Sequence, residues 1–163
     1  MKSIRFISLL VLFVILAQTS VKAQLTLQIY SYTNNQWENH YWIDKDVVKK
    51  SIDGQWANYY WHDSTQNVIK NSDGAKWVNY LWLNRTENTL KISQNGQWVN
   101  FFWVNPQEPT VIKIAIEGTW VNHFWLDGNV VKKSVNGAWE NFAVIKGGTL
   151  DMLFLSALLY EFN

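Results

Sequence analysis

Gly54-Gln55-Trp56-Ala57-Asn58-Tyr59-Tyr60-Trp61 is the most complete copy of a pattern that occurs six times in this chain of 163 residues. In every copy an asparagine follows the first tryptophan by two residues, and in five copies a second tryptophan follows the asparagine by three. Successive first tryptophans are 19 to 22 residues apart and are Trp37, Trp56, Trp77, Trp98, Trp120 and Trp139. A nearly constant period of this length is typical of a protein built from repeats.

Each repeat has the composition of two β-strands. The half with the tryptophans is rich in aromatic and β-branched residues, which favour strands, and a run such as Val47-Val48-Lys49-Lys50 follows it. An Asp or Asn stands seven residues after the first tryptophan, where its side chain favours a turn. These residues are Asp44, Asp63, Asn84, Asn105 and Asp127. The second run ends in most repeats at Asp-Gly or Asn-Gly, which is a strong short-range signal for a β-hairpin.

A two-residue turn at the glycine determines which residues face each other across the hairpin. The expected pairs in one repeat are Ser51 with Trp56, Lys49 with Asn58, and Val47 with Tyr60. The hairpins that turn at Gly96, Gly118 and Gly137 likewise place a small residue opposite the first tryptophan and a lysine opposite the asparagine. The hairpin at Asp73-Gly74-Ala75 has one extra residue, which predicts a bulge there.

Alternation along the strands divides the side chains between two faces. One face carries the first tryptophan, the asparagine and the lysine. The other face is more uniformly apolar, so we assign it to the core. It carries the second tryptophans, which are Trp42, Trp61, Trp82, Trp103 and Trp125. Beside them we expect the pairs Val48 with Tyr59, Leu90 with Phe101, Ile112 with His123, and Val131 with Phe142.

The predicted fold class is all-β, an antiparallel meander of about six tryptophan-rich hairpin repeats with about thirteen strands. It forms either a closed barrel or a stacked hairpin solenoid. We expect residues 1–23 to be a signal peptide and residues 24–163 to be a single β-repeat domain. Within this domain, residues 24–35 form an N-terminal cap strand, 36–148 the repeats, and 149–163 a C-terminal cap that is a strand or a short helix.

The N-terminus has the pattern of a secretory signal peptide. Lys2 and Arg5 precede an apolar run, and Val21-Lys22-Ala23 suits cleavage. A retained membrane anchor is one alternative, although the run is short for a bilayer span. An outer-membrane barrel is another, although strands of about six to eight residues are shorter than the roughly nine to eleven required. We expect a secreted protein, extracellular or periplasmic, without stable membrane insertion.

Charge limits the classes of partner. Cleavage of the signal peptide would remove 3 of the 14 basic residues and none of the 13 acidic ones, leaving a net charge of −2. This charge does not favour nucleic acid or an anionic membrane surface as a partner.

Catalysis has little support in the sequence, because an enzyme would need an acidic residue outside the repeats in a pocket and the sequence shows no good candidate. The chain has no cysteine, which excludes disulfides, thiol chemistry and cysteine-ligated metals. The three histidines, His40, His62 and His123, are scattered among aromatic residues, and no two carboxylates stand out as a general acid and base. There is no phosphate-binding loop and no metal-ligand spacing. We therefore expect no enzyme activity, no cofactor and no metal site.

The face with the first tryptophans has the composition of a binding surface. An exposed indole offers a flat apolar surface to a sugar ring, and an asparagine supplies a donor and an acceptor for hydroxyl groups. A lysine adds a donor, or a charge for an acidic sugar. Several equivalent sites on one body would bind with avidity. The predicted ligand-binding residues are Trp37, Asn39, Trp56, Asn58, Lys49, Trp77, Asn79, Trp98, Asn100, Lys91, Trp120, Asn122, Lys113, Trp139, Asn141 and Lys132.

The function predicted from these residues is non-catalytic, lectin-like binding of glycans or cell-surface polysaccharide. Two alternatives remain open. The first tryptophans could instead form the core, with the asparagines satisfying backbone groups at a bulge. The aromatic face could also serve self-association in a structural or adhesive surface protein, so an oligomer is possible. The exposure of the first tryptophans distinguishes the core interpretation from the other two.

Two turns and the aromatic residues near them resemble a known family. Asn95-Gly96-Gln97-Trp98 with Phe101-Phe102, and Asn136-Gly137-Ala138-Trp139, are similar to the choline- and glucan-binding repeats of bacterial cell-wall proteins. The resemblance covers residues 36–142. It departs from that family in having Val-x-Lys in place of an internal Gly-Trp pair, and in having the Trp-x-Asn core. It implies a stack of hairpins whose aromatic side chains hold cell-surface ligands, without identifying the ligand.

Overall fold

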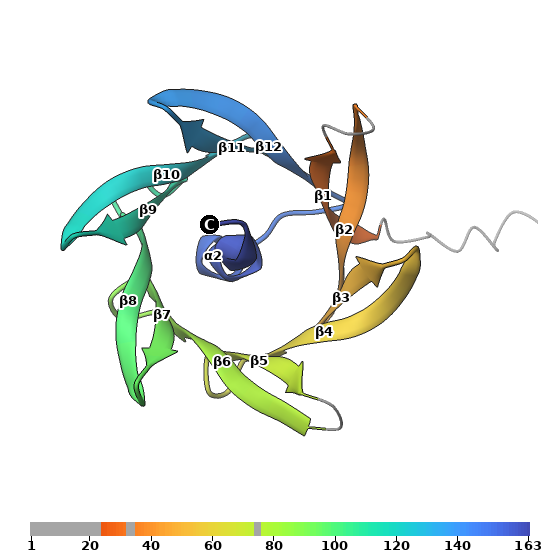
Figure 1. Cartoon of the computed structure of the whole chain (residues 1–163), viewed down its shortest axis with the longest axis horizontal. Helices are drawn as coiled ribbons and strands as arrows, with labels where there is room; N and C mark the ends of the chain where they lie inside the picture. The colour runs from red at the N-terminus through yellow and green to blue at the C-terminus, as the bar shows by residue number, and fades with distance from the viewer. Residues whose placement is uncertain (1–23, 32–34, 74–75) are drawn as a thin grey trace, which may run out of the picture.

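A computed structural model describes residues 24–31, 35–73 and 76–163. It shows a closed antiparallel barrel around a short C-terminal helix (Figure 1). Each strand pairs with its neighbours in sequence, and the first strand pairs with the last to close the ring. The predicted all-β meander is therefore confirmed, with the closed barrel rather than the solenoid as its form. The predicted signal peptide, residues 1–23, lies outside the described residues.

The described part of the chain contains twelve strands, one helix and one 3-10 turn. The strands are β1 (Leu25–Ser31), β2 (Gln36–Asp44), β3 (Val47–Ile52), β4 (Gln55–Asp63), β5 (Val68–Asp73), β6 (Lys76–Asn84), β7 (Thr89–Gln94), β8 (Gln97–Val104), β9 (Val111–Ile116), β10 (Thr119–Asp127), β11 (Val130–Val135) and β12 (Ala138–Lys146). The helix is α2 (Met152–Leu159), and the turn η1 (Tyr160–Phe162) follows it. There are fewer strands than the thirteen predicted, and the C-terminal segment, which the sequence left as strand or helix, is helical.

The glycine turns have the predicted geometry. Asp53 and Gly54 both have positive φ, of 49° and 76°, and Asn136 and Gly137 have φ of 50° and 83°. A type I′ turn requires positive φ at both central residues, which Asp, Asn and Gly tolerate best. The predicted register next to these turns is also confirmed. The observed pairs include Ser51 with Trp56, Lys49 with Asn58, Ser134 with Trp139, and Lys132 with Asn141.

A β-bulge follows the asparagine in each hairpin. In the hairpin of β3 and β4, Lys49 pairs with Asn58 but Val48 pairs with Tyr60, so Tyr59 has no partner on β3. The predicted pairing of Val47 with Tyr60 is therefore wrong, and Val47 pairs with Trp61. The same shift occurs in the other five hairpins. An extra residue reverses the alternation beyond it, which a count of residues from the turn cannot show.

The bulge places the second tryptophans on the outside of the barrel. Tyr60 is buried and Tyr59 packs against the core, whereas Trp61 is only half-buried and contacts Trp77. Placing the second tryptophans (Trp42, Trp61, Trp82, Trp103 and Trp125) in the core was therefore wrong. Val48, Leu90, Ile112 and Val131 are buried as predicted. Their partners, however, are Tyr60, Phe102, Phe124 and Ala143, each one residue later than predicted.

The hairpin of β5 and β6 has the same register as the others. Ser72 pairs with Trp77 and Lys70 with Asn79, and Asp73 faces Lys76. The additional bulge predicted at this turn is wrong. The two residues between the paired positions are 74 and 75, one residue later than the sequence suggested, and both lie outside the described residues.

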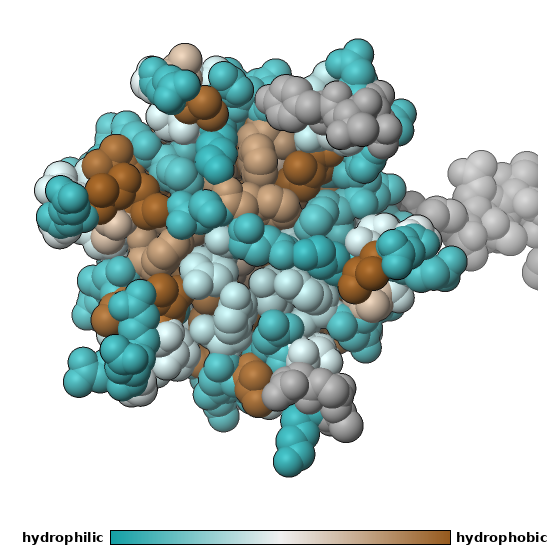
Figure 2. All heavy atoms as spheres, viewed as in Figure 1, coloured by the Kyte–Doolittle hydropathy of each residue, from teal (hydrophilic) through white to brown (hydrophobic). Residues whose placement is uncertain are grey.

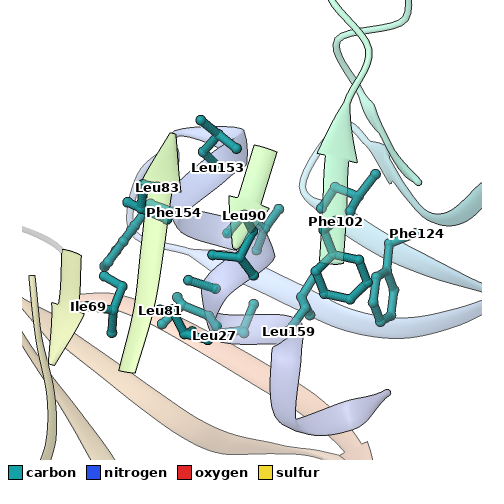
Figure 3. Packing of buried hydrophobic residues seen from close by; sticks show 14 of the residues in the cluster. Leu27, Ile69, Leu81, Leu83, Leu90, Phe102, Phe124, Leu153, Phe154 and Leu159 are labelled. Carbon is teal, nitrogen blue, oxygen red and sulfur yellow. The ribbon is translucent and has the colours of Figure 1, made fainter. Parts of the chain in front are cut away.

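Helix α2 lies inside the barrel (Figure 1), where seven of its eight residues are buried. Leu153, Phe154 and Leu159 lie close to side chains of the barrel wall such as Leu83 and Phe102 (Figure 3). The helix is apolar on all sides because the wall surrounds it. Its N-terminus is capped by Asp151, whose carboxylate accepts a hydrogen bond from the backbone N–H of Phe154 at 3.0 Å.

The turn η1 attaches the end of the chain to the barrel wall. Lys50 Nζ lies 2.6 Å from Glu161 Oε2, and the Tyr59 hydroxyl donates to the same oxygen at 3.3 Å. Lys133 Nζ donates to the carbonyl oxygen of Phe162 at 2.6 Å. These bonds hold the helical segment at both ends, because Asp151 is also paired with Arg85 at 3.3 Å.

Replacing Tyr41 by phenylalanine is expected to stabilise the protein by about 1 kcal/mol. Tyr41 is fully buried, and its hydroxyl has no hydrogen-bond partner among the described residues. Removing an unsatisfied buried hydroxyl relieves a desolvation cost. Phe102 and Phe124 occupy the equivalent position in other repeats. Urea unfolding would measure the change, and Tyr60→Phe is the control, because the Tyr60 hydroxyl is hydrogen-bonded to Tyr59. A lower midpoint for Tyr41→Phe would contradict the expectation.

Candidate functional site: five outer tryptophan clusters

The outside of the barrel carries five copies of one group of side chains, which we call the outer clusters. Each contains the second tryptophan of one hairpin, a lysine from the next strand and the first tryptophan of the strand after it. They are Trp42–Lys49–Trp56, Trp61–Lys70–Trp77, Trp82–Lys91–Trp98, Trp103–Lys113–Trp120 and Trp125–Lys132–Trp139. Each cluster therefore spans the seam between two consecutive hairpins.

The geometry is similar in all the clusters except Trp103–Lys113–Trp120, where the ring planes are inclined at only 41°. In the first, the Lys49 ammonium nitrogen lies 4.1 Å from the centre of the Trp42 ring. The ring centres of Trp42 and Trp56 are 6.0 Å apart, with the planes inclined at 72°. Both contacts are favourable, since a cation is attracted to an indole face and aromatic pairs prefer edge-to-face packing.

The hairpin register produces this arrangement. Trp56 pairs with Ser51, whose small side chain lets the indole lie across β3 and reach Trp42 on β2. Lys49 pairs with Trp42 on one side and Asn58 on the other, so its side chain lies against the indole. The other clusters also have a small residue opposite the first tryptophan, namely Ser72, Ser93, Ala115 and Ser134.

The first tryptophans and the asparagines lie at the surface. Trp56, Trp77 and Trp98 are each 37% exposed and Trp139 is 38% exposed, whereas Trp120 is half-buried. The asparagines two residues further on are all exposed and are Asn39, Asn58, Asn79, Asn100, Asn122 and Asn141. The lysines are half-buried. The interpretation of the first tryptophans as core residues is therefore wrong.

The seam where β12 meets β1 has no outer cluster. Val144 stands in place of a second tryptophan, and Gln28 pairs with it where the other seams have lysine. Tyr30, not a small residue, faces Trp37, and the two rings pack edge to face at 5.1 Å. Gln28 Nε2 donates to Asn39 Oδ1 at 2.8 Å. The structure therefore separates Trp37 and Asn39 from the other predicted site residues.

Each cluster lysine also has a carboxylate partner. The nitrogen–oxygen distances are 3.5 Å for Lys49–Asp44, 2.9 Å for Lys70–Asp63, 2.7 Å for Lys91–Glu87, 2.8 Å for Lys113–Glu108 and 2.7 Å for Lys132–Asp127. The bonded lysine lowers the pKa of the carboxyl groups of Asp63, Glu87 and Glu108. These carboxylates stay ionised, and paired, well into the acidic range.

Sequence reasoning missed the second tryptophans, Lys70 and the carboxylates. The second tryptophans were placed on the wrong face because of the bulge. Lys70 was not included because the turn after β5 was placed one residue too early, although its pairing with Asn79 matches that of Lys49 with Asn58. Each acid stands only a few residues before its lysine in the sequence, across the turn that joins their two strands, and this proximity is a signal that could have indicated the pair.

The histidines lie away from the outer clusters. His40 and His123 occupy the bulge position equivalent to Tyr59, and His62 stacks on Phe154 of the helix at 5.1 Å. Among the described residues, no group of three or more His, Cys, Asp or Glu side chains is placed to hold a metal ion. Within the same part of the chain, no helix has the length and apolarity needed to cross a membrane.

Lowering the pH from about 6.5 to 4 is expected to destabilise the protein through His123. Burial, with a smaller effect of Lys133, lowers the pKa of His123 to about 4 in the folded state. The unfolded chain, with a histidine pKa of about 6.5, binds more protons in this window, so stability falls as the pH falls. After allowance for partial exposure, we expect a loss of about 1–2 kcal/mol.

His123→Phe should reduce this loss, and thermal unfolding at pH 7 and pH 4.5 would measure it. Phenylalanine fits the site, since Phe101 and Phe142 occupy the equivalent position. His62, whose pKa burial also lowers, contributes a further dependence of the same sign. An unchanged difference between the two pH values would contradict the assignment to His123.

Comparisons with known proteins identify no relatives. No model of a protein family matches the chain, and neither curated proteins nor solved structures gave a match. The similarity to cell-wall repeats therefore stays a prediction from sequence motifs.

Proposed function

We propose that this chain is a secreted, non-catalytic and multivalent glycan-binding protein whose outer clusters are its binding sites. The observation that supports this most directly is the partial exposure of the first tryptophans in four of the five clusters. The barrel interior is filled without them, by α2 and by the aromatic and aliphatic residues of the wall. Repeated apolar surface of this kind on the outside of a protein indicates a binding surface.

The chemistry of an outer cluster suits a sugar. The indole of Trp98 offers apolar surface to the C–H groups of a sugar ring. The exposed amide of Asn100, two residues away, can donate to and accept from hydroxyl groups. Five weak sites around one ring would bind a surface that displays many copies of a glycan, because each bound site raises the effective concentration at the others. Cell-surface polysaccharide, outside the cell or in the periplasm, is the partner that fits this arrangement.

A structural or adhesive role is the second candidate, and one observation favours it. The strands β2 and β3 form four residue pairs, against six between β3 and β4, so backbone pairing is shorter across the seams. Contacts such as that of Trp42 with Trp56 join the hairpins there. Figure 2 shows one end of the barrel. The apolar patches on the projecting hairpins are separated there by hydrophilic residues, so among the described residues this end has no continuous apolar surface for self-association.

Binding to a panel of immobilised neutral and acidic polysaccharides tests the proposal, with Trp98→Ala as the informative variant. We expect binding by the parent protein and at least about tenfold weaker binding by the variant, because an exposed tryptophan contributes about 2 kcal/mol or more at a binding site. Surface plasmon resonance would measure the change.

Trp37→Ala is the matched control. It also removes a first tryptophan and one aromatic contact, but at the seam without an outer cluster. Its binding should equal that of the parent. Equal losses in both variants, or a parent protein that binds no glycan while Trp98→Ala lowers the unfolding temperature, would favour the structural role.

A further inference from the structure

In every outer cluster a carboxylate pairs with the lysine, and the acidic residue comes from one of two places in the repeat. In three clusters the residue two positions after the second tryptophan is an aspartate, and it pairs with the lysine directly. In the other two that residue is Asn84 or Asn105, which cannot balance a charge. There the loop supplies Glu87 to Lys91 and Glu108 to Lys113. Each cluster therefore contains one positive and one negative charge, although the repeats differ in sequence.

The two charges are not equally accessible. The lysine side chains are 13 to 24% exposed and lie against the second tryptophan. Four of the carboxylate side chains are 48 to 52% exposed. The accessible charge of such a cluster is therefore the carboxylate, while the ammonium group is largely covered and already paired.

From this arrangement we infer that the outer clusters select uncharged glycans. The inference rests on the proposed function and specifies its ligand class. Hydroxyl groups of a neutral sugar donate hydrogen bonds to the exposed carboxylate through the oxygen that is not bonded to the lysine, while the ring lies on the first tryptophan. A uronate, sialate or sulfate group would be repelled by that carboxylate and would find no free ammonium group. The lysine thus positions the carboxylate and is not a receptor for acidic sugars.

The clusters are not equivalent in this respect. The side chain of Asp63 is only 13% exposed. It is bonded to Lys70 and accepts from the backbone N–H groups of Thr65 and Gln66 at 3.2 and 3.1 Å. Its oxygens are already occupied, so the Trp61–Lys70–Trp77 cluster is the weakest of the five. Trp77→Ala should therefore reduce binding less than Trp98→Ala.

The test compares neutral polysaccharides (laminarin, mannan and dextran) with acidic ones (alginate, polygalacturonate and hyaluronan), each immobilised at equal density. We expect the parent protein to bind at least one neutral polysaccharide and none of the acidic ones, with little change between 50 and 300 mM NaCl. The double variant Glu87→Gln/Glu108→Gln exposes the charges of Lys91 and Lys113. It should bind the neutral ligand at least about threefold more weakly and should gain salt-sensitive binding to the acidic ones.

The matched control is Asp53→Asn/Glu117→Gln, which removes two exposed carboxylates at glycine turns outside the clusters. It makes the same change in net charge and should bind as the parent does. Binding of the parent to acidic polysaccharides alone would overturn the inference while leaving glycan binding in place. Binding to none of the six would overturn both. Should the double variant fail to show a native thermal transition, Glu87→Gln alone is compared with Glu117→Gln, and equal behaviour of these two would also overturn the inference.

Discussion

Leu155→Asp is expected to leave the protein unfolded at 25 °C. Leu155 is fully buried at the middle of α2, inside the barrel. The variant loses the packing of a leucine, which costs about 2–5 kcal/mol, and also buries a carboxylate among apolar side chains without a partner. Together these costs approach the 5–15 kcal/mol that stabilises a typical domain. Near-ultraviolet circular dichroism and size-exclusion chromatography would detect the loss of structure.

Two comparisons make the prediction specific to the barrel interior. Leu155→Ala should fold, with a free energy of unfolding lower by about 2–5 kcal/mol. Met152→Glu should have a much smaller effect, because Met152 is only half-buried at the edge of the core and an acidic residue is favourable in the first turn of a helix. A Leu155→Asp protein that unfolds within a few degrees of the parent would show that the helix does not fill the barrel.

The barrel depends on the helix for its stability because a ring of this width is not filled by its own side chains. An eight-stranded barrel is just wide enough for its own side chains to fill, and a barrel of twelve strands is wider. Here the wall contributes large side chains such as Tyr60 and Phe102, and the helix occupies the space that remains between them. The helix is therefore part of the core of the barrel.

Gly147→Ala is expected to destabilise the protein by several kcal/mol more than Gly137→Ala, although both glycines have nearly the same φ, 85° and 83°. A methyl group at Gly137 would meet open space, so the cost is the backbone strain alone, about 1–2 kcal/mol. At Gly147 it would overlap the carbonyl group of Gln24. The chain entering β1 would have to move.

The additional cost of Gly147→Ala arises because β1 closes the ring. It pairs with β12 through residues such as Thr26 and Leu27, and with β2 on its other edge. Displacing Gln24 therefore strains the contact between the two ends of the sheet. Chemical denaturation of both variants would measure the difference. Equal unfolding midpoints would show that the first strand shifts without cost.

Much of the fold was predictable because it depends on local geometry. The Asn-Gly and Asp-Gly turns determine the register of the first half of each hairpin, so the pairing of Lys49 with Asn58 followed from counting. The site was predictable only in part for the same reason. Trp56, Lys49 and Asn58 lie close to one turn, whereas Trp42 and Asp44 come from the preceding hairpin. Counting residues from a turn does not predict which residues meet across the seam between two hairpins or beyond the bulge.

The amino-acid sequence by itself determined that this protein is an antiparallel series of repeated hairpins with first tryptophans and asparagines on one face, because two-residue turns and alternation act over a few residues. Only the tertiary structure decided which way the second tryptophans point. The bulge at Tyr59 lets both Tyr59 and Tyr60 face the interior, which a regular strand would not allow. It also decided that the C-terminal helix fills the ring and that β1 meets β12. Those features depend on the volume inside the barrel and on contacts between distant parts of the chain, and no local pattern encodes either.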